Sequence, residues 1–363
     1  MRRLDITQQR LANQHIGFPG LKKPADVVRW LVAVQAQDYA GAKWALGLRL
    51  KRATETEIEQ AFTDGSILRT HLMRPTWHFV TSADIRWLLA LTSPRVHSIN
   101  AHMYRKLELD DTIFKRSNAT LAKALRGGQT LTRDELRSVL EREGIAVNGD
   151  LRMSYFMMRA ELDAIVCSGP RRGKQFTYAL LDERVPETKT RARDEALVEL
   201  ARRYFVSRGP ATVQDFAKWS GLTVIDGRNG LEGVKRHLQC EIVAERSYWF
   251  PTSIPDAGDA SPNAHLLSIY DEYISSYKDR SAMVSESYAA KLSGLGNALS
   301  YIVVIDGQIV GTWKRTITKN SVTIEPNFFK RLAPAERQAV EIAAQRYAQF
   351  VGLPLVSVKA SHR

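Results

Sequence analysis

The amino-acid sequence predicts an α+β fold in which several small modules are followed by an antiparallel sheet. The chain has 363 residues, which is long for a single hydrophobic core, so we expect more than one module. Helix-forming and strand-forming segments recur in one order as far as residue 251. A segment rich in Pro, Gly, Asp and Ser, residues 251–265, then leads into strand-like alternation, and we read this segment as a linker.

The most regular module is expected at residues 126–190. Thr132 is followed three residues later by Glu135, which is capping-box spacing and predicts the start of a helix. A second helix runs into a strand near Cys167, and the stretch GPRRGKQFTYAL reads as a basic turn and a return strand. The order helix, helix, strand, turn and strand is that of a winged helix-turn-helix, whose wing is the turn between the strands.

Residues 191–255 repeat this order. Thr212 and Asp215 stand at capping-box spacing, although the acid is Asp rather than Glu. The stretch LEGVKRHLQCEIVAERSYWF then predicts a helix that leads into two strands. A further winged-helix module is therefore expected here.

Residues 1–125 are expected to form the first and least regular copy. A helix begins at Pro24, because a helix N-terminus accepts proline, and ETEIEQAFTDG and LRTHLMRPTWHFV follow as a short helix and an extended segment. Additional helices are expected, with a basic helical stretch from Pro94 to about Leu125. The sequence thus predicts three tandem winged-helix modules.

Residues 256–363 are predicted to form a small antiparallel β-barrel-like subdomain around which the modules pack. Alternation runs through LSYIVVIDGQIVGTWKRTITKNSVTIEP, with Asp306-Gly307 as a hairpin turn. The stretch LAPAERQAVEIAAQRYAQFVG predicts an amphipathic C-terminal helix that ends at Gly352, and LPLVSVK predicts a last short strand.

The chain is strongly basic, with a formal net charge of +13 and a pI of about 9.7. Such a charge favours nucleic acid, an anionic membrane or another polyanion as partner, with simple solubility as the alternative. Cys167 and Cys240 are the only cysteines, which indicates a reducing compartment. The N-terminal residues lack the apolar core of a signal peptide, and no stretch has the ~20 apolar residues of a membrane span. We expect a soluble cytoplasmic monomer that binds no membrane.

Several chemistries are not supported by any motif. The sequence contains no P-loop, no GxSxG nucleophile elbow and no HExxH pair, and His97 and His102 are spaced wrongly for one helix face. We therefore expect no metal and no cofactor. The neighbouring Asp271 and Glu272 would suit a carboxylate hydrolase, but a helix cap or a salt-bridge network is the favoured interpretation.

Basic residues gather where winged-helix modules contact phosphate. Arg171, Arg172 and Lys174 lie in the predicted wing of the second module. Lys and Arg at such positions neutralise phosphates and make binding salt-dependent, whereas the alternative is a solvated basic turn. The full set of expected DNA-contacting residues is Lys43, Arg69, His71, Arg74, Arg171, Arg172 and Lys174.

Two amides stand near the end of an apolar run, in VVRWLVAVQAQDYAGAKWALGLRL. A buried amide without partners costs roughly 1–3 kcal/mol, so Gln35 and Gln37 need either hydrogen-bond partners or a cavity. If the helix continued, the two would lie about 80° to either side of the apolar stripe, at ~100° per residue. If the backbone were extended, both would point the same way. The alternative to a shared cavity is hydrogen bonding to backbone at a junction between modules.

Five stretches in this order resemble the AlkZ/YcaQ family: VQAQDYAGAKWALGLRL, LRTHLMRPTWHFV, RYFVSRGPATVQDFAKWSGL, YDEYISSYKDRS and IDGQIVGTWKRTI. The resemblance covers nearly the whole chain and implies a DNA glycosylase that unhooks interstrand crosslinks, with tandem winged helices around a small β-barrel. It also implies a catalytic Gln-hydrophobic-Gln signature, which Gln35-Ala36-Gln37 matches. Asp38 falls one position late for the Asp of YcaQ-like members and receives no catalytic role.

A pair of amides is chemically adequate only for an activated leaving group. An amide neither gives nor takes a proton near pH 7. An N7-alkylated purine is already cationic and leaves as a neutral base, so what remains is to place water against C1′ and stabilise an oxocarbenium-like sugar. We therefore expect a monofunctional glycosylase for N7-alkylpurines in double-stranded DNA, including bulky adducts and crosslinks, with Gln35 and Gln37 as catalytic residues. The alternative is a non-catalytic winged-helix regulator or architectural protein.

Overall fold

The computed structural model describes residues 4–17, 20–187, 191–253, 261–293 and 301–358. Helices and strands both contribute throughout, so the predicted mixture of the two is confirmed. Within the described residues, three units share one element order: helix, short strand or bridge, two helices, and two antiparallel strands. A five-stranded sheet follows them. Part of the predicted linker, residues 254–260, lies outside the described residues.

The first unit contains the predicted catalytic segment. Its three-stranded sheet has the order β1-β3-β2, so that β1 is an edge strand. Its elements, with the preceding helix, are α1 (Ile6–Asn13), α2 (Pro24–Leu31), β1 (Val34–Gln35), α3 (Tyr39–Arg49), α4 (Glu55–Thr63), β2 (Ile67–Leu72) and β3 (Thr76–Thr81).

The helical stretch expected from Pro94 to about Leu125 is helical, but it begins earlier and is divided into α5 (Ile85–Lys106) and α6 (Asp111–Leu125). Pro94 lies inside α5, which packs against α10, β2 and α8. The break comes after α5, because Glu108 adopts a left-handed φ of 52° and Asp110 caps the next helix.

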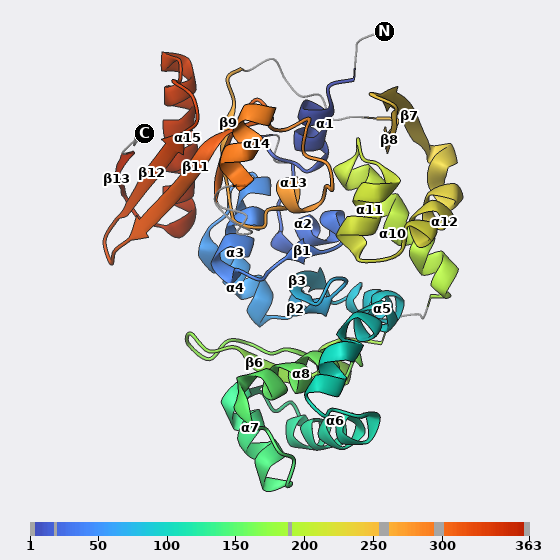
Figure 1. Ribbon diagram of the computed structural model, residues 1–363. Helices are drawn as coiled ribbons and strands as arrows, with labels where there is room; N and C mark the ends of the chain where they lie inside the picture. Colours follow the sequence, from blue (N-terminus) through green and yellow to red (C-terminus); the bar gives the residue numbers. More distant parts are fainter. Residues whose placement is uncertain (1–3, 18–19, 188–190, 254–260, 294–300, 359–363) are drawn as a thin grey trace.

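The second unit has a hydrophobic core largely of its own, whereas the first unit, the third unit and the five-stranded sheet share a single core. In Figure 1 it lies below the rest of the molecule, joined to it through α5. Its capping box at Thr132 and Glu135 is present as predicted. Its elements are α6, β4 (Leu131–Thr132), α7 (Arg133–Arg142), α8 (Gly149–Leu162), β5 (Val166–Ser168), β6 (Thr177–Leu180) and α9 (Leu181–Arg184).

The third unit and the five-stranded sheet lie on opposite sides of the first unit (Figure 1). The third unit has its predicted capping box at Thr212 and Asp215, and an isolated bridge between Ala211 and Trp249 stands where the others have a short strand. Its elements are α10 (Arg193–Arg208), α11 (Val213–Ser220), α12 (Val224–Val234), η1 (Lys235–His237), β7 (Leu238–Val243) and β8 (Arg246–Pro251).

The C-terminal sheet has the strand order β13-β12-β11-β10-β9. Asp306-Gly307 forms the predicted hairpin turn, and the amphipathic helix ends at Gly352 as expected. The last strand, β13, pairs parallel to β12, so the sheet is not purely antiparallel. Its elements and the helices beside them are β9 (Ala264–Leu267), α13 (Glu272–Ser275), α14 (Glu286–Ser293), β10 (Ile302–Ile305), β11 (Gln308–Ile317), β12 (Val322–Phe328), α15 (Pro334–Val351) and β13 (Leu355–Val358).

Candidate active site

The segment that carries the two glutamines is extended, because α2 ends at Leu31. Val32 has φ 66° and ψ −55°, and the Ala33 N–H donates to the Leu31 carbonyl over 2.7 Å. This is a three-residue γ-turn in a backbone region that is strained for a β-branched side chain. The turn redirects the chain out of the helix and into β1.

The pairing of β1 with β3 points both glutamines away from the core. Gln35 lies opposite His78, and the Ala36 N–H donates to the Trp77 carbonyl over 2.7 Å. Ala36 is fully buried, whereas Gln35 is partly exposed and Gln37 is exposed. Since side chains alternate along an extended chain, the two amides lie on the face opposite Ala36. Of the two geometries considered from the sequence, the extended one is present.

The protein holds both amide carbonyls only loosely. Gln35 Oε1 accepts from an Arg74 Nη at 3.3 Å, and Gln37 Oε1 accepts from the backbone N–H of Trp77 at 3.4 Å. Both distances exceed the usual 2.7–3.2 Å of N–H···O bonds. Hydrogen bonding to backbone, the alternative interpretation, is therefore found at Gln37, but it is weak and leaves the carbonyl partly available.

The backbone around the amides is held much more firmly than their side chains. The Gln35 N–H donates to Glu272 over 2.9 Å, and the Ala36 carbonyl accepts from Arg69 Nε at 3.0 Å. Arg69 lies over the ring of Trp77, 4.1 Å from its centroid. The segment is thus a rigid platform for two adaptable side chains.

Glu272 and its neighbour Asp271 are structural carboxylates. Both are completely buried, and Asp271 forms a bidentate ion pair with Arg49 at 2.8 and 2.9 Å. Burial by itself raises the pKa of Glu272, but the Arg208 guanidinium and the hydrogen bonds from Arg208 and the Gln35 N–H outweigh this and lower the pKa to about 2. A general acid needs the opposite shift, so the salt-bridge interpretation of this acidic pair holds.

His78 is a site residue that the sequence analysis missed. Its Nδ1 lies 2.9 Å from the Thr76 carbonyl, and within the described part of the chain its Nε2 has no hydrogen-bond partner. Burial, reinforced by the charge of Arg74, lowers its pKa to about 3, so the ring is neutral at physiological pH. His78 lies in one of the stretches that carry the family resemblance, but its pairing with Gln35 is visible only in the structure.

Most of the predicted DNA-contacting residues are already engaged within the protein. The amine of Lys43 is paired with Glu55 and Glu59, both at 2.5 Å, and the Lys43 side chain is only 6% exposed. His71 is buried and paired with Glu161.

The three cations of the predicted wing differ in their surroundings. Arg171 is partly buried and pairs with Glu59 at 2.9 Å, Arg172 pairs with Glu135 at 2.8 Å on the surface, and Lys174 is exposed. The isolated bridge between Arg172 and Gln175 closes the turn that carries them. DNA contact by these residues remains a prediction.

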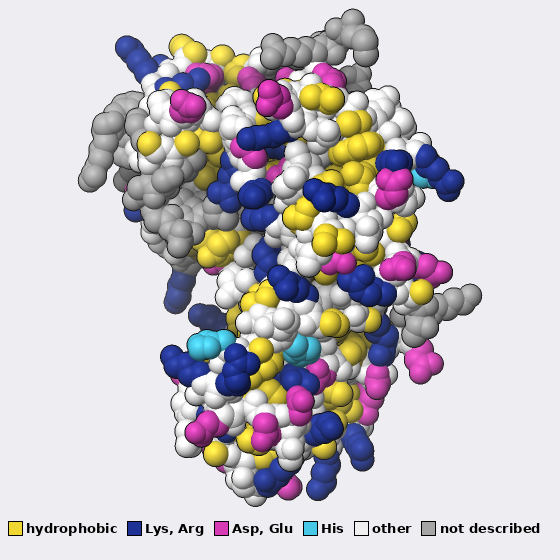
Figure 2. Space-filling model, turned by 45° about the vertical axis from the view of Figure 1, so that its right-hand side comes forward, with side chains coloured by type: hydrophobic (Ala, Val, Ile, Leu, Met, Phe, Trp, Pro, Cys, Tyr) yellow, Lys and Arg dark blue, Asp and Glu magenta, His cyan; other side chains and the backbone are white. Residues whose placement is uncertain are grey.

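One of the predicted cations, Arg74, contacts a glutamine directly. Arg74 bridges the first and third units by donating to Gln35 and to the carbonyls of Lys218 and Trp219. Burial, followed by the charges of Arg74 and Arg280, lowers the pKa of Lys218 to about 8. Figure 2 shows Lys and Arg side chains along the middle of one face of the molecule. Arg74 was predicted from the sequence, whereas Lys218 and Arg280 were not, although both lie in stretches that carry the family resemblance.

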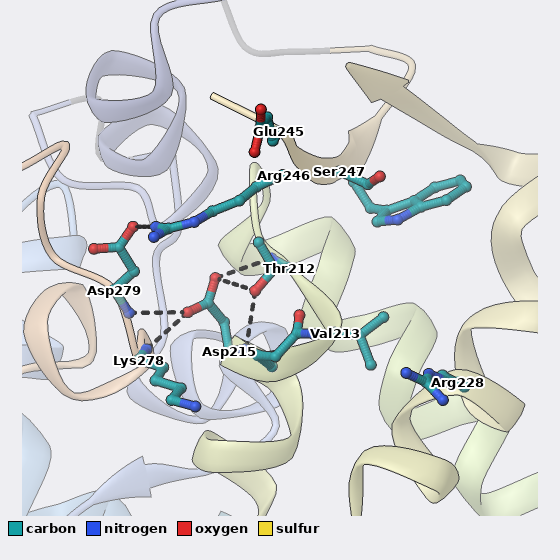
Figure 3. A pocket seen from close by; sticks show the side chains of 11 residues that line it. Thr212, Val213, Asp215, Arg228, Glu245, Arg246, Ser247, Lys278 and Asp279 are labelled. Carbon is teal, nitrogen blue, oxygen red and sulfur yellow. Dashed lines mark hydrogen bonds and ion pairs between the residues drawn. The ribbon is translucent and has the colours of Figure 1, made fainter. Parts of the chain in front are cut away.

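A cavity of about 700 Å³ lies elsewhere, and neither glutamine lines it. In Figure 3 the Asp215 carboxylate accepts from Thr212 and from the backbone N–H groups of Lys278 and Asp279, and Arg246 pairs with Asp279. Asp215 thus joins α11 to residues 278–279, and Asp279 joins this segment to β8. Among the described residues no cluster of three His, Cys, Asp or Glu side chains is placed to hold a metal ion, and no helix is long and apolar enough to cross a membrane.

Gln35 and Gln37 thus lie on one face of an extended segment, and Arg74, which contacts Gln35, bridges the first and third units. The family model described as "DNA glycosylase AlkZ-like" matches residues 28–350, and the chain belongs to this family. The expected family and the expected enzyme class, DNA glycosylase, are thereby confirmed.

Two comparisons with individual proteins agree. The chain is 24% identical over 354 residues to an "interstrand DNA cross-link repair glycosylase" of Streptomyces sahachiroi, with 92% of each chain covered. It also resembles the solved structure of Streptomyces sahachiroi DNA glycosylase AlkZ, with a TM-score of 0.80, 22% identity, and coverage of 98% of this chain and 99% of that one. The second likeness shows the fold.

Proposed function

We propose that this chain is a monofunctional glycosylase that hydrolyses the N-glycosidic bond of cationic N7-alkylpurines in double-stranded DNA. One observation carries the proposal: Gln35 and Gln37 lie on the same face of an extended segment whose backbone is held by Glu272 and Arg69. Two loosely held carbonyls fixed to a rigid backbone suit the placing of a water against C1′ and the stabilisation of a sugar cation.

The groups around the glutamines favour a lesion that is already activated. Glu272 is committed to Arg208, and its low pKa keeps it from donating a proton. His78 is neutral, and its pKa of about 3 makes it a weak base. Because neither Glu272 nor His78 is suited to protonate a departing base, a cationic N7-alkylpurine, which leaves as a neutral base, is the fitting substrate.

The proposal extends to the organisation of the chain on DNA. We assign the three repeated units to winged-helix modules, of which the second begins with α6 and so before the predicted boundary at residue 126, and the five-stranded sheet and its helix to a subdomain at 256–363. The identical element order of the three units supports this assignment. The Streptomyces relative is an interstrand DNA cross-link repair glycosylase, which supports interstrand crosslinks as substrates. A monomeric state and a cytoplasmic location remain expectations.

The decisive experiment is excision from a duplex that holds one N7-alkylguanine, read as strand breakage after hot alkali. We expect product from this duplex and none from matched duplexes with an undamaged guanine or a neutral lesion, because neither Glu272 nor His78 is suited to act as a general acid. Crosslinked duplexes are the second substrate. Tight binding to a defined sequence without any excision would instead identify a non-catalytic regulator.

The wing of the second unit offers a test of DNA contact. Lys174→Ala removes an exposed cation, so we expect weaker binding at all sequences and a slope of log K against log salt that is shallower by about one. Binding titrations from low to moderate salt would measure it. Lys235→Ala is the matched control, because Lys235 is exposed but paired with Glu232 at 2.6 Å. An unchanged slope for Lys174→Ala would remove this residue from the interface.

A further inference from the structure

The turn that ends α2 is clamped from one side by a single guanidinium. Arg208, at the end of α10, donates from Nη1 to the Leu31 carbonyl over 2.8 Å and from Nη2 to the Ala33 carbonyl over 3.0 Å. These two carbonyls flank Val32, whose left-handed conformation is costly for a β-branched residue. Arg208, which is distant in sequence, thus bonds the residue before and the residue after the strained Val32.

The same guanidinium is tied to the strand that follows the turn. Arg208 Nη2 donates to Glu272 Oε2 over 2.8 Å, and Glu272 Oε1 accepts from the Gln35 N–H over 2.9 Å. Gln35 and His78 form a non-hydrogen-bonded pair in the ladder, so this N–H points away from β3 at an open sheet edge. Glu272 takes the place of the missing neighbouring strand.

The pair is built to stay charged and rigid. Both side chains are 0% exposed, and Glu272 Oε2 also accepts from Trp219 Nε1 at 2.9 Å and Ser276 Oγ at 2.8 Å. Arg208 Nε donates to the same Ser276 hydroxyl over 2.9 Å. Every carboxylate oxygen is occupied, so neither group is free to touch a substrate.

We infer that Arg208 and Glu272 form a positioning unit for the proposed reaction. This unit fixes the backbone position of Gln35 at the sheet edge and so the direction of its side chain. The inference rests on the proposed function, in which Gln35 aligns water and the sugar cation. The unit acts through the backbone of Gln35, so its loss lowers the rate of bond cleavage and leaves the recognition of DNA nearly intact.

The test is single-turnover excision of N7-alkylguanine by Glu272→Gln and Glu272→Asp. The amide removes the charge that Arg208 needs, and the aspartate keeps the charge but is one methylene too short to reach both partners. We expect the excision rate of each to fall at least tenfold with little change in the Kd for lesion DNA. In a Gln35→Ala background the same changes should cost almost nothing more, because the residue they position is gone.

A matched control separates positioning from stability. Asp271→Asn breaks the adjacent buried pair with Arg49 but does not touch Leu31, Ala33 or Gln35, so excision below the unfolding temperature should stay near that of the wild type. Rates in Glu272→Gln and Glu272→Asp equal to that of Asp271→Asn, or full additivity with Gln35→Ala, would overturn the inference while leaving the proposed function intact.

Hydrogen exchange at the Gln35 amide gives a readout that needs no catalysis. We expect the Gln35 amide to be protected in the wild type and to exchange much faster in Glu272→Gln. In Asp271→Asn the Gln35 amide should be as well protected as in the wild type. If the wild-type chain excises no lesion, the proposed function fails, and exchange then decides whether the pair orders the strand. Equal protection in the wild type and Glu272→Gln would overturn the inference.

Discussion

Replacement of both glutamines, Gln35→Ala with Gln37→Ala, is expected to lower excision of N7-alkylguanine by at least about 100-fold, the scale on which removal of oriented transition-state dipoles acts. The two carbonyls point to the same face from a backbone that other residues hold, so their removal leaves the fold in place. DNA affinity should change little. Single-turnover excision and equilibrium binding of the same lesion duplex measure the two effects separately.

The single variants sharpen this expectation. Gln35, which touches Arg74 and lies beside His78, and Gln37, which is more exposed, should each contribute to the rate. Gln214→Ala is the matched control, since it removes an exposed amide from the wall of the other cavity. Unchanged excision in the double variant would contradict the assignment and reduce the two amides to surface residues at a junction between units.

Arg49→Ala is expected to destabilise the chain by about 3–5 kcal/mol, the cost of removing one partner of a buried ion pair. Arg49 is 0% exposed and donates to both oxygens of Asp271, to the Gln14 side chain and to the Ala45 carbonyl. Its loss leaves the Asp271 carboxylate buried without its counter-ion. Urea unfolding followed by tryptophan fluorescence would measure the change in the free energy of unfolding.

A surface pair supplies the comparison. Arg202 pairs with Glu199 one helical turn away, and the two side chains are 48% and 23% exposed. Arg202→Ala should therefore cost only about 0.3–0.5 kcal/mol. An Arg49→Ala variant as stable as Arg202→Ala would contradict the prediction, because it would show that the buried ion pair contributes no more to stability than the surface pair.

Local signals in the sequence were sufficient for much of the architecture. The capping boxes at Thr132 and Thr212 and the turn at Asp306-Gly307 depend only on neighbouring residues, and the structure has them where the sequence predicts them. The family could also be predicted from the sequence, because five short stretches, one of which contains Gln35-Ala36-Gln37, occur in the same order as in AlkZ-like members. The capping boxes and the turn could be predicted because their hydrogen-bond partners lie within a few residues along the chain.

Long-range partners decided what the sequence left open. Whether the chain at Gln35 was helical or extended depended on Arg208 and Glu272, which are more than 170 residues away and hold the turn and the strand edge. The same applies to the predicted DNA-contacting cations: Lys43 and His71 are paired with acids that only the fold brings to them. A sequence by itself determines which groups are charged and which segments can turn, whereas the tertiary structure decides which charges are neutralised, because ion pairs form between residues that are near in space and distant along the chain.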